Sequence, residues 1–239
     1  CHVRVGATVD AVGRSRFLSC MRELDAAARP AIAEALDVAL ADATQSDQPE
    51  ALEDLLRAAP EAEDHDLAHA ILPLCTHASA PVRHAALAAL PKVYGQRAKP
   101  LLRDALRDDD ESVCRTAIDG LRRVGGIDVL VLHRLKPILT GDEDASDELR
   151  ALAAAALTDV DAGQRNAALD ALKRTLHPRT SMVSLFIKSE EANPMLVEAV
   201  CRTMLSIGGP KERRLVSKHA ARSRPPLRQR LEALLDQLA

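Results

Sequence analysis

Aromatic side chains are almost absent from this chain of 239 residues, which has no Trp, one Tyr and two Phe. A compact globule usually fills its centre with such large side chains. Thin layers of helices do not need them, because small residues let helix axes approach closely. The hydrophobic content of 47% is still ample for a core, and it consists mostly of Ala, Leu and Val. The composition therefore favours layered helices over one compact globule.

Signals of membrane and secreted proteins are missing as well. No run approaches the roughly 20 apolar residues that cross a bilayer, because Asp128, His133, Arg134 and Lys136 interrupt the longest one at 127–139. The five cysteines are odd in number and widely spaced, without a CxxC pair, which is typical of a reducing compartment. No secretory signal peptide is visible. We therefore expect a cytoplasmic protein without a membrane span.

The N-terminal part differs from the rest. Residues 3–9 alternate like a strand, and the remainder of the sequence offers no sheet partner for them, so we interpret residues 1–14 as the remnant of an upstream segment or domain. Alternatively, Cys1 would suit a mature lipoprotein whose terminal Cys carries lipid. Residues 15–62 show helical spacing of apolar residues and are expected to form a helical cap or a degenerate repeat. A regular repeat array is expected over residues 63–239.

Charge is nearly balanced but unevenly placed. The chain has 35 acidic and 32 basic residues, a net charge of −3, which argues against a protein that coats nucleic acid along its whole length. Acids dominate residues 23–66, whereas cations dominate residues 211–230. Such polarity can steer an acidic partner, or another copy of the same chain, into one orientation.

One pattern recurs along the chain and is the strongest signal in it. From an anchor at Val82, small or aliphatic residues occur three, four and five positions later, and a Leu occurs at eight. The same template recurs from Val113 and Leu149, and weaker copies start at Gln164 and Leu227. A repeated unit of this kind cannot bury its apolar face alone and must stack on its neighbours. Gln164 lies only 15 residues after Leu149, so either one helix is inserted there or first and second helices exchange roles.

Two-helix units with an Asp-rich turn and a Val-Arg-x-Ala-Ala-Leu-x-x-Leu helix resemble HEAT repeats, and the short period resembles their bacterial HEAT-like variety. The resemblance implies an all-α fold, a right-handed α-solenoid of about five or six stacked antiparallel helix pairs. It also implies a ladder in which the Arg after each anchor bonds an Asp of a turn. Arg83, Arg150, Arg165 and Arg228 occupy that position, and Cys114 departs from it.

The resemblance favours a non-catalytic scaffold that presents a curved surface to another protein. Template offsets two, six and ten are free of packing duties, and on second helices they would form the floor of that surface. The basic stretch would add an electrostatic anchor for a partner with an acidic surface. The candidate partner-binding residues are His84, Lys92, Arg115, Asp119, Arg123, Asn166, Asp170, Arg174, Lys211, Arg213, Arg214, Lys218 and Arg222.

Two other functions remain as alternatives. Some HEAT-like proteins are DNA glycosylases, but handling of bases normally uses aromatic stacking or a wedge, and this chain has no Trp. The second alternative function is that of a HEAT-like lyase or protein-modification factor. Catalytic signals are weak, since no GxSxG elbow surrounds a Ser or Cys. His65 and His69 lie one helical turn apart near Cys75 and His77, a spacing that can bind a metal, but a polar helix face is the commoner cause. We expect no cofactor and no metal.

Overall fold

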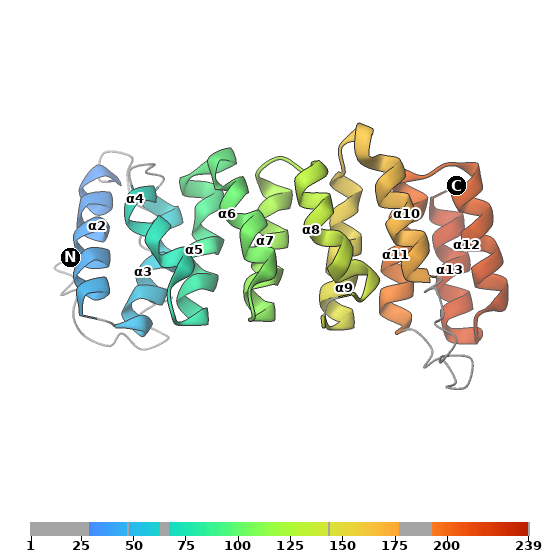
Figure 1. Ribbon diagram of the computed structural model, residues 1–239, viewed down its shortest axis with the longest axis horizontal. Helices are drawn as coiled ribbons and strands as arrows, with labels where there is room; N and C mark the ends of the chain where they lie inside the picture. The colour runs from blue at the N-terminus through green and yellow to red at the C-terminus, as the bar shows by residue number, and fades with distance from the viewer. Residues whose placement is uncertain (1–28, 47, 63–66, 143, 177–192, 239) are drawn as a thin grey trace. The chain divides into compact units, whose positions relative to one another are not determined.

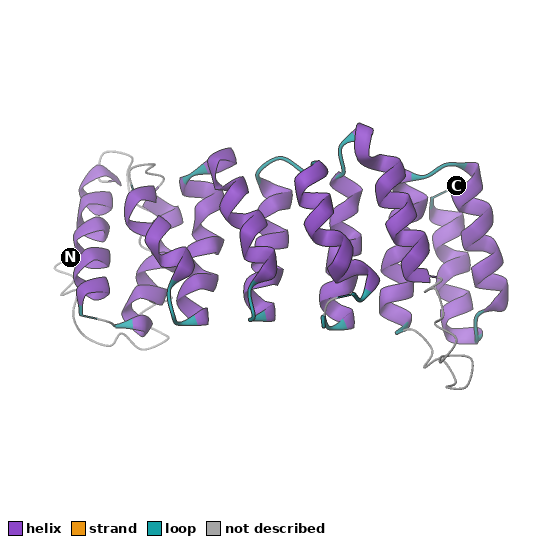
Figure 2. Cartoon of the chain, in the orientation of Figure 1, coloured by secondary structure: helices purple, strands orange, loops and turns teal. Residues whose placement is uncertain are grey.

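The computed structural model describes residues 29–46, 48–62, 67–142, 144–176 and 193–238. Its helices form six pairs in the described ranges (Figures 1 and 2). The all-α repeat fold predicted from the sequence is confirmed. No strand occurs in the part described, where Ile127 and Val160 form an isolated parallel bridge. The strand-like residues 3–9 lie outside it.

The chain divides into two compact units, Cys1–Val124 (unit 1) and Gly125–Ala239 (unit 2). In unit 1 the second helices form a layer in which α5 packs between α3 and α7, and α2 packs on α3. The helices of unit 1 are α2 (Arg29–Gln45), α3 (Pro49–Ala62), α4 (Ala68–Ile71) with η2 (Leu72–Thr76), α5 (Ala80–Val93), η3 (Gly95–Ala98), α6 (Lys99–Asp104) with η4 (Ala105–Arg107), and α7 (Glu111–Arg123).

Unit 2 contains three pairs in its described residues. The second helices α9, α11 and α13 pack side by side, and the first helix α8 contacts α10. The helices of unit 2 are α8 (Val129–Thr140), α9 (Asp147–Ala156) with η5 (Leu157–Asp159), η6 (Ala162–Gln164) with α10 (Arg165–Leu176), α11 (Pro194–Ile207), α12 (Pro210–Arg222) and α13 (Pro225–Gln237).

Local side-chain chemistry determines where helices start. The carboxylate of Asp110 accepts the Ser112 N–H at 2.8 Å, and that of Asp128 accepts the N–H groups of Leu130 and Val131 at 2.9 Å. These bonds satisfy backbone donors that the first turn of a helix leaves free. The Ser146 hydroxyl accepts the Leu149 N–H at 3.1 Å in the same way. The polar turns between pairs therefore fix where α7, α8 and α9 begin.

The repeat template explains the core. At the three strong copies its anchors Val82, Val113 and Leu149 are buried, as are Leu90, Leu121 and Leu157 eight positions later. Ala residues at the intermediate positions are largely buried as well, which lets neighbouring helices approach closely. The positions that the sequence assigned to packing are thus the positions that pack in both units.

The packing of α10 decides between the two interpretations of the template copy anchored on Gln164. It forms α10, which contacts α8 and precedes α11 as the first helix of its pair. The roles of first and second helix therefore exchange at this copy. The placement of Asn166, Asp170 and Arg174 on a second helix is wrong. The template identifies any helix that has one face of small residues, but it does not indicate whether that helix is the first or the second of its pair.

Candidate functional site

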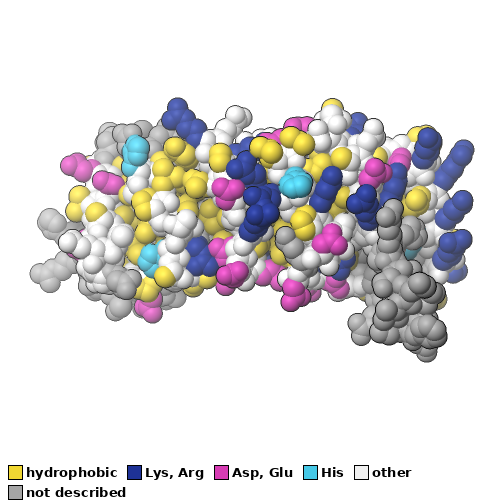
Figure 3. All heavy atoms as spheres, in the orientation of Figure 1, with side chains coloured by type: hydrophobic (Ala, Val, Ile, Leu, Met, Phe, Trp, Pro, Cys, Tyr) yellow, Lys and Arg dark blue, Asp and Glu magenta, His cyan; other side chains and the backbone are white. Residues whose placement is uncertain are grey.

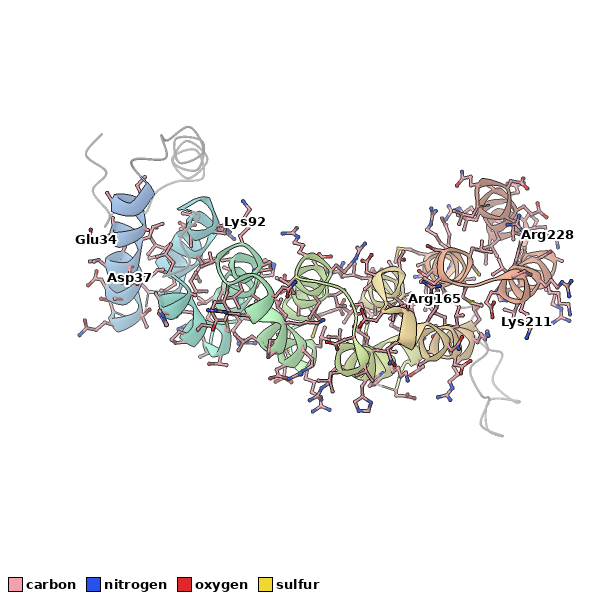
Figure 4. All side chains as sticks on the ribbon, turned by 90° about the horizontal axis from the view of Figure 1, so that it is seen from above. Glu34, Asp37, Lys92, Arg165, Lys211 and Arg228 are labelled. Atoms are coloured by element: carbon pink, nitrogen blue, oxygen red, sulfur yellow. The ribbon has the colours of Figure 1, made fainter. Side chains whose placement is uncertain are left out.

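An open groove lies between the second helices α5 and α7 of unit 1. It has a volume of about 130 Å³, and its lining residues are Ala88, Pro91, Thr116, Asp119, Gly120 and Arg123. Ala88, Asp119 and Arg123 are exposed, and Thr116 and Pro91 are half-buried. Lys92, near the end of α5, projects outward from the ribbon (Figure 4) and is not part of the lining. The groove therefore has a small apolar floor with charged groups along one side.

Small side chains keep this groove open. Ala88 and Gly120 contribute little or no side chain to it, although both lie on well-formed helices. Gly120 is also the point where α7 approaches α6, since a Cβ built on it would lie 2.7 Å from Leu102 Cδ2 and 3.4 Å from Pro91 Cγ. A larger residue at 120 would thus press into the core as well as into the groove. The absence of a side chain at Gly120 thus accounts both for the close packing of α7 on α6 and for the groove between α5 and α7.

The groove carries two charged groups without partners. Among the hydrogen bonds and ion pairs of the described residues, none involves the Asp119 carboxylate or the Arg123 guanidinium. Arg115 differs, because its Nη2 pairs with Glu111 Oε1 at 3.2 Å on the exposed side of α7. A ligand could therefore engage Asp119 and Arg123 without first breaking a contact inside the protein.

The predicted ladder supports the same two helices. Arg83 donates from Nε and Nη2 to the two carboxylate oxygens of Asp108, at 2.7 and 2.6 Å. Its Nη1 donates to the carbonyls of His77 and Ala78 at 2.9 and 3.0 Å. Arg83 lies in the first turn of α5 and Asp108 lies in the turn before α7, so the pair holds successive repeats in register. A role in packing is confirmed for Arg83.

These contacts set the electrostatics around Asp108. Burial alone would raise the pKa of the Asp108 carboxyl, but the hydrogen bonds from Arg83 and from the Asp110 N–H outweigh burial and lower it. The pKa of Asp110 is also lowered, chiefly by its hydrogen bonds with Ser112. Both carboxylates are therefore held in the charged form, in which they accept the hydrogen bonds that stabilise the turn before α7.

The ladder does not continue in the same form. Cys114 places its Sγ 3.2 Å from the Asp108 carbonyl oxygen. Arg150 bonds within its own pair, to the Leu139 carbonyl at 3.3 Å and to Asp147 at 3.1 Å. Arg228 donates to the Ala221 carbonyl at 3.0 Å. In the described residues these arginines satisfy helix ends, and only Arg83 reaches an Asp of the next turn.

The basic stretch of unit 2 splits into two kinds of residue. Lys211, Arg214, Lys218 and Arg222 are exposed on one face of α12. Arg213 is different, because its guanidinium donates to the carbonyls of Leu235 and Leu238 at 2.6 and 2.9 Å and so caps the end of α13. Arg213, predicted as a candidate partner-binding residue, therefore already has hydrogen-bond acceptors within unit 2. Sequence alone could not reveal this, since the acceptors lie 22 and 25 residues away.

The remaining candidates fall at separate places. His84 lies on α5 next to Arg83, whereas Asn166, Asp170 and Arg174 are exposed on α10 in unit 2. Pro91, Thr116 and Gly120 line the groove but were not predicted. The signal for them was available, because Thr116 and Gly120 flank predicted positions on α7, but their exposure depends on how α5 and α7 cross.

The candidate metal ligands do not assemble in the part of the chain that the structure describes. His65 lies outside it, and no group of three His, Cys, Asp or Glu residues within it is placed to hold a metal ion. His77 Nδ1 accepts the Ser79 N–H at 3.1 Å. Burial raises the pKa of the Cys75 thiol to about 12. Cys75 and His77 are thus explained by local structure.

No helix in the described residues is long and apolar enough to cross a membrane. Among known protein families, the family model for HEAT repeats matches residues 68–173. The matched segment contains α5, α7, α9 and α10, which carry the template copies from Val82 to Gln164. No curated protein matches the chain.

Two solved structures are similar to the chain. Human deoxyhypusine hydroxylase, in complex with glycerol, is 19% identical with a TM-score of 0.44, and the alignment covers 97% of this chain and 81% of that one. A designed armadillo repeat protein is 18% identical with a TM-score of 0.47, and the alignment covers 85% of this chain and 100% of that one.

Proposed function

We propose that this chain, whose residues 68–173 match the family model for HEAT repeats, is a non-catalytic scaffold that binds another protein through the groove between α5 and α7. The observation that carries this proposal is the coincidence of two independent features. Three of the lining residues, Ala88, Asp119 and Arg123, occupy template offsets six and ten, which packing leaves free. Of these, Asp119 and Arg123 have no partner among the described residues. Stacked repeats commonly use such surfaces to bind proteins without chemistry.

The lining indicates the kind of ligand. The floor of Ala88, Pro91 and Gly120 suits a small apolar side chain, and Thr116 offers a hydroxyl beside it. Arg123 can form two parallel hydrogen bonds with a carboxylate, while Asp119 can accept N–H groups of a peptide backbone. A short peptide segment with an acidic residue next to a small apolar one meets these requirements.

Photo-crosslinking in the source cells tests the proposal. A photoreactive amino acid at Ala88 should give a protein adduct, and one at Ala233 should not. Ala233 is a matched control because it is an exposed Ala on a helix of unit 2. An equal adduct pattern from both positions would contradict the proposal.

The partner found in this way is then purified and its affinity is measured. A88L fills the groove and should raise the dissociation constant about tenfold, equivalent to about 1.4 kcal/mol of binding free energy, whereas A233L should leave it unchanged. Both positions are exposed, so stability should change by less than about 0.5 kcal/mol. Unchanged affinity of A88L would exclude the groove, and chemical conversion of the partner by the chain would exclude a non-catalytic role.

A further inference from the structure

The exposed side of α12 carries charges of one sign. The cations Lys211, Arg214, Lys218 and Arg222 succeed one another at intervals of three, four and four residues. This spacing places them on one face of α12, over a length of about 16 Å. Figure 3 shows Lys and Arg side chains gathered over this part of unit 2. We call these four residues the basic stripe.

The basic stripe has no acidic partner within the described part of the protein. The acid of α12, Glu212, is buried and bonds Lys173 Nζ at 2.9 Å and the Gly209 N–H at 3.0 Å. Glu198 of α11 pairs with Arg202 and Arg230. Among the described residues, no member of the stripe forms an ion pair or side-chain hydrogen bond. Four neighbouring like charges repel each other, so a complementary surface would relieve that repulsion.

A complementary surface occurs on α2 of unit 1. Glu34, Asp37 and Asp42 are exposed there, and none of them has an ion pair with a described residue. The three residues span about 12 Å along the helix, which fits within the length of the basic stripe, and about 140° around it, with Glu34 between Asp37 and Asp42. Figure 4 shows Glu34 and Asp37 on the side of α2 that faces away from α3. We call these three residues the acidic face.

The rest of the α2 surface permits close approach. Exposed Ala31, Ala35 and Ala41 lie near the acids on α2, and Val38 among them is 64% exposed. The stripe on α12 is likewise flanked by small exposed residues, Ser217 and Ala221. Small side chains on both helices allow packing at the short axial distances seen between helices of proteins, and the contact would bury Val38.

We propose that the basic stripe of one copy binds the acidic face of a second copy of the chain. The interface is head-to-tail, because it joins two different surfaces of identical molecules. A second copy fits better than nucleic acid, because the protein itself supplies an exposed acidic helix surface that fits within the length of the stripe. Phosphate recognition would not require the acidic face at all. The inference goes beyond the scaffold function and involves no residue of the groove.

Sedimentation velocity on the full chain tests this interface. The wild type should associate at about 10 mM salt, where the Debye length is about 30 Å, and dissociate at about 1 M salt, where it is about 3 Å. R214E/K218E should raise the dissociation constant about tenfold or more, because it places like charges opposite each other. E34K/D37K should do the same from the other side.

Mixing the two variants gives the decisive observation. Each variant should be monomeric alone, but the mixture should associate, since the intact acidic face of R214E/K218E meets the intact basic stripe of E34K/D37K. R97E/R107E is the matched control, because it reverses two exposed arginines of unit 1 and changes the net charge equally. Circular dichroism verifies folding, and R214Q/K218Q serves if a reversal variant unfolds.

Several outcomes would overturn the proposal. A wild type that stays monomeric at low salt would do so, as would equal loss of association in R97E/R107E. Association that R214E/K218E leaves intact would also exclude the stripe. A monomer whose stripe gives a salt-dependent shift of labelled DNA would assign these cations to nucleic acid instead. A88L should associate like the wild type, so a negative result at this interface leaves the groove proposal standing.

Discussion

Arg83 joins two successive repeats through contacts that a lysine could not reproduce. Its planar guanidinium bonds both oxygens of Asp108 and two backbone carbonyls at once, whereas an ammonium group acts as a single point charge. The two side chains are only 17% and 12% exposed. Removing Arg83 therefore leaves two carbonyls without this donor and a mostly buried carboxylate with the Asp110 N–H as its remaining donor.

We expect R83M to lower the free energy of unfolding of unit 1 by about 2 kcal/mol, since hydrogen bonds to charged groups contribute about 1.5–3 kcal/mol. Urea unfolding followed by circular dichroism measures the change. R103M is the matched control, because Arg103 pairs with an Asp104 that is 62% exposed, and exposed pairs contribute about 0–1 kcal/mol. Equal effects of R83M and R103M would mean that the link adds nothing.

The pH dependence of this link has a definite sign. The folded state lowers the pKa of Asp108 below its usual value of 3.8, so the link stabilises the fold above that value. The stabilisation is lost as the pH falls through the folded-state pKa. The difference between wild type and R83M should therefore be constant near neutral pH and shrink below about pH 4. A difference that stays constant down to strongly acidic pH in urea titrations would rule out Asp108 as the partner that matters.

At the scale of helices, the junction of α11 and α12 in unit 2 depends on close backbone approach. Gly208 and Gly209 alone join the two helices. A Cβ on Gly208 would overlap the Met204 carbonyl oxygen and the Glu212 side chain. The sequence indicated a helix stop at these glycines, and the structure shows that Gly208 is needed for close approach rather than for a left-handed backbone.

Glu212 is the side chain around which this junction is built. The hydrogen bond from the Gly209 N–H and then that from Lys173 lower the pKa of the Glu212 carboxyl. E212A should destabilise unit 2 by about 1–2 kcal/mol, since it removes a helix cap and an ion pair together. K173M should cost less, because Lys173 is 35% exposed and the cap remains. Thermal unfolding of both variants tests this order, which a larger effect of K173M would contradict.

A single helix could be predicted from the sequence where its position depends only on its own residues. The template located α5, α7 and α9, because a buried face at helical spacing needs only the residues of that helix. It misplaced α10, whose membership of the first layer depends on contact with α8. The groove depends in the same way on how α5 and α7 pack. Arg213 shows a third case, in which the partner carbonyls belong to the end of another helix.

At the scale of the whole molecule, each unit contains a buried thiol that reports on its core. Cys75 in unit 1 and Cys201 in unit 2 are 8% and 0% exposed. Burial raises the pKa of each thiol from the usual value of 9.0 to about 12. At one pH this lowers the thiolate fraction about a thousandfold, since each pH unit is a factor of ten. Labelling by a thiol reagent therefore requires the surrounding unit to open.

Single-cysteine variants that keep only Cys75 or only Cys201 should thus separate the stabilities of the two units. With R83M added, labelling of Cys75 in mild urea should accelerate about tenfold or more, as about 2 kcal/mol implies, while Cys201 labelling should change little. E212A should give the reverse pattern. A cysteine at exposed position 233 is the control and should react at once in every background. If both thiols accelerate equally with either substitution, unit 1 and unit 2 unfold as one cooperative structure, and the division into two cores has no energetic meaning.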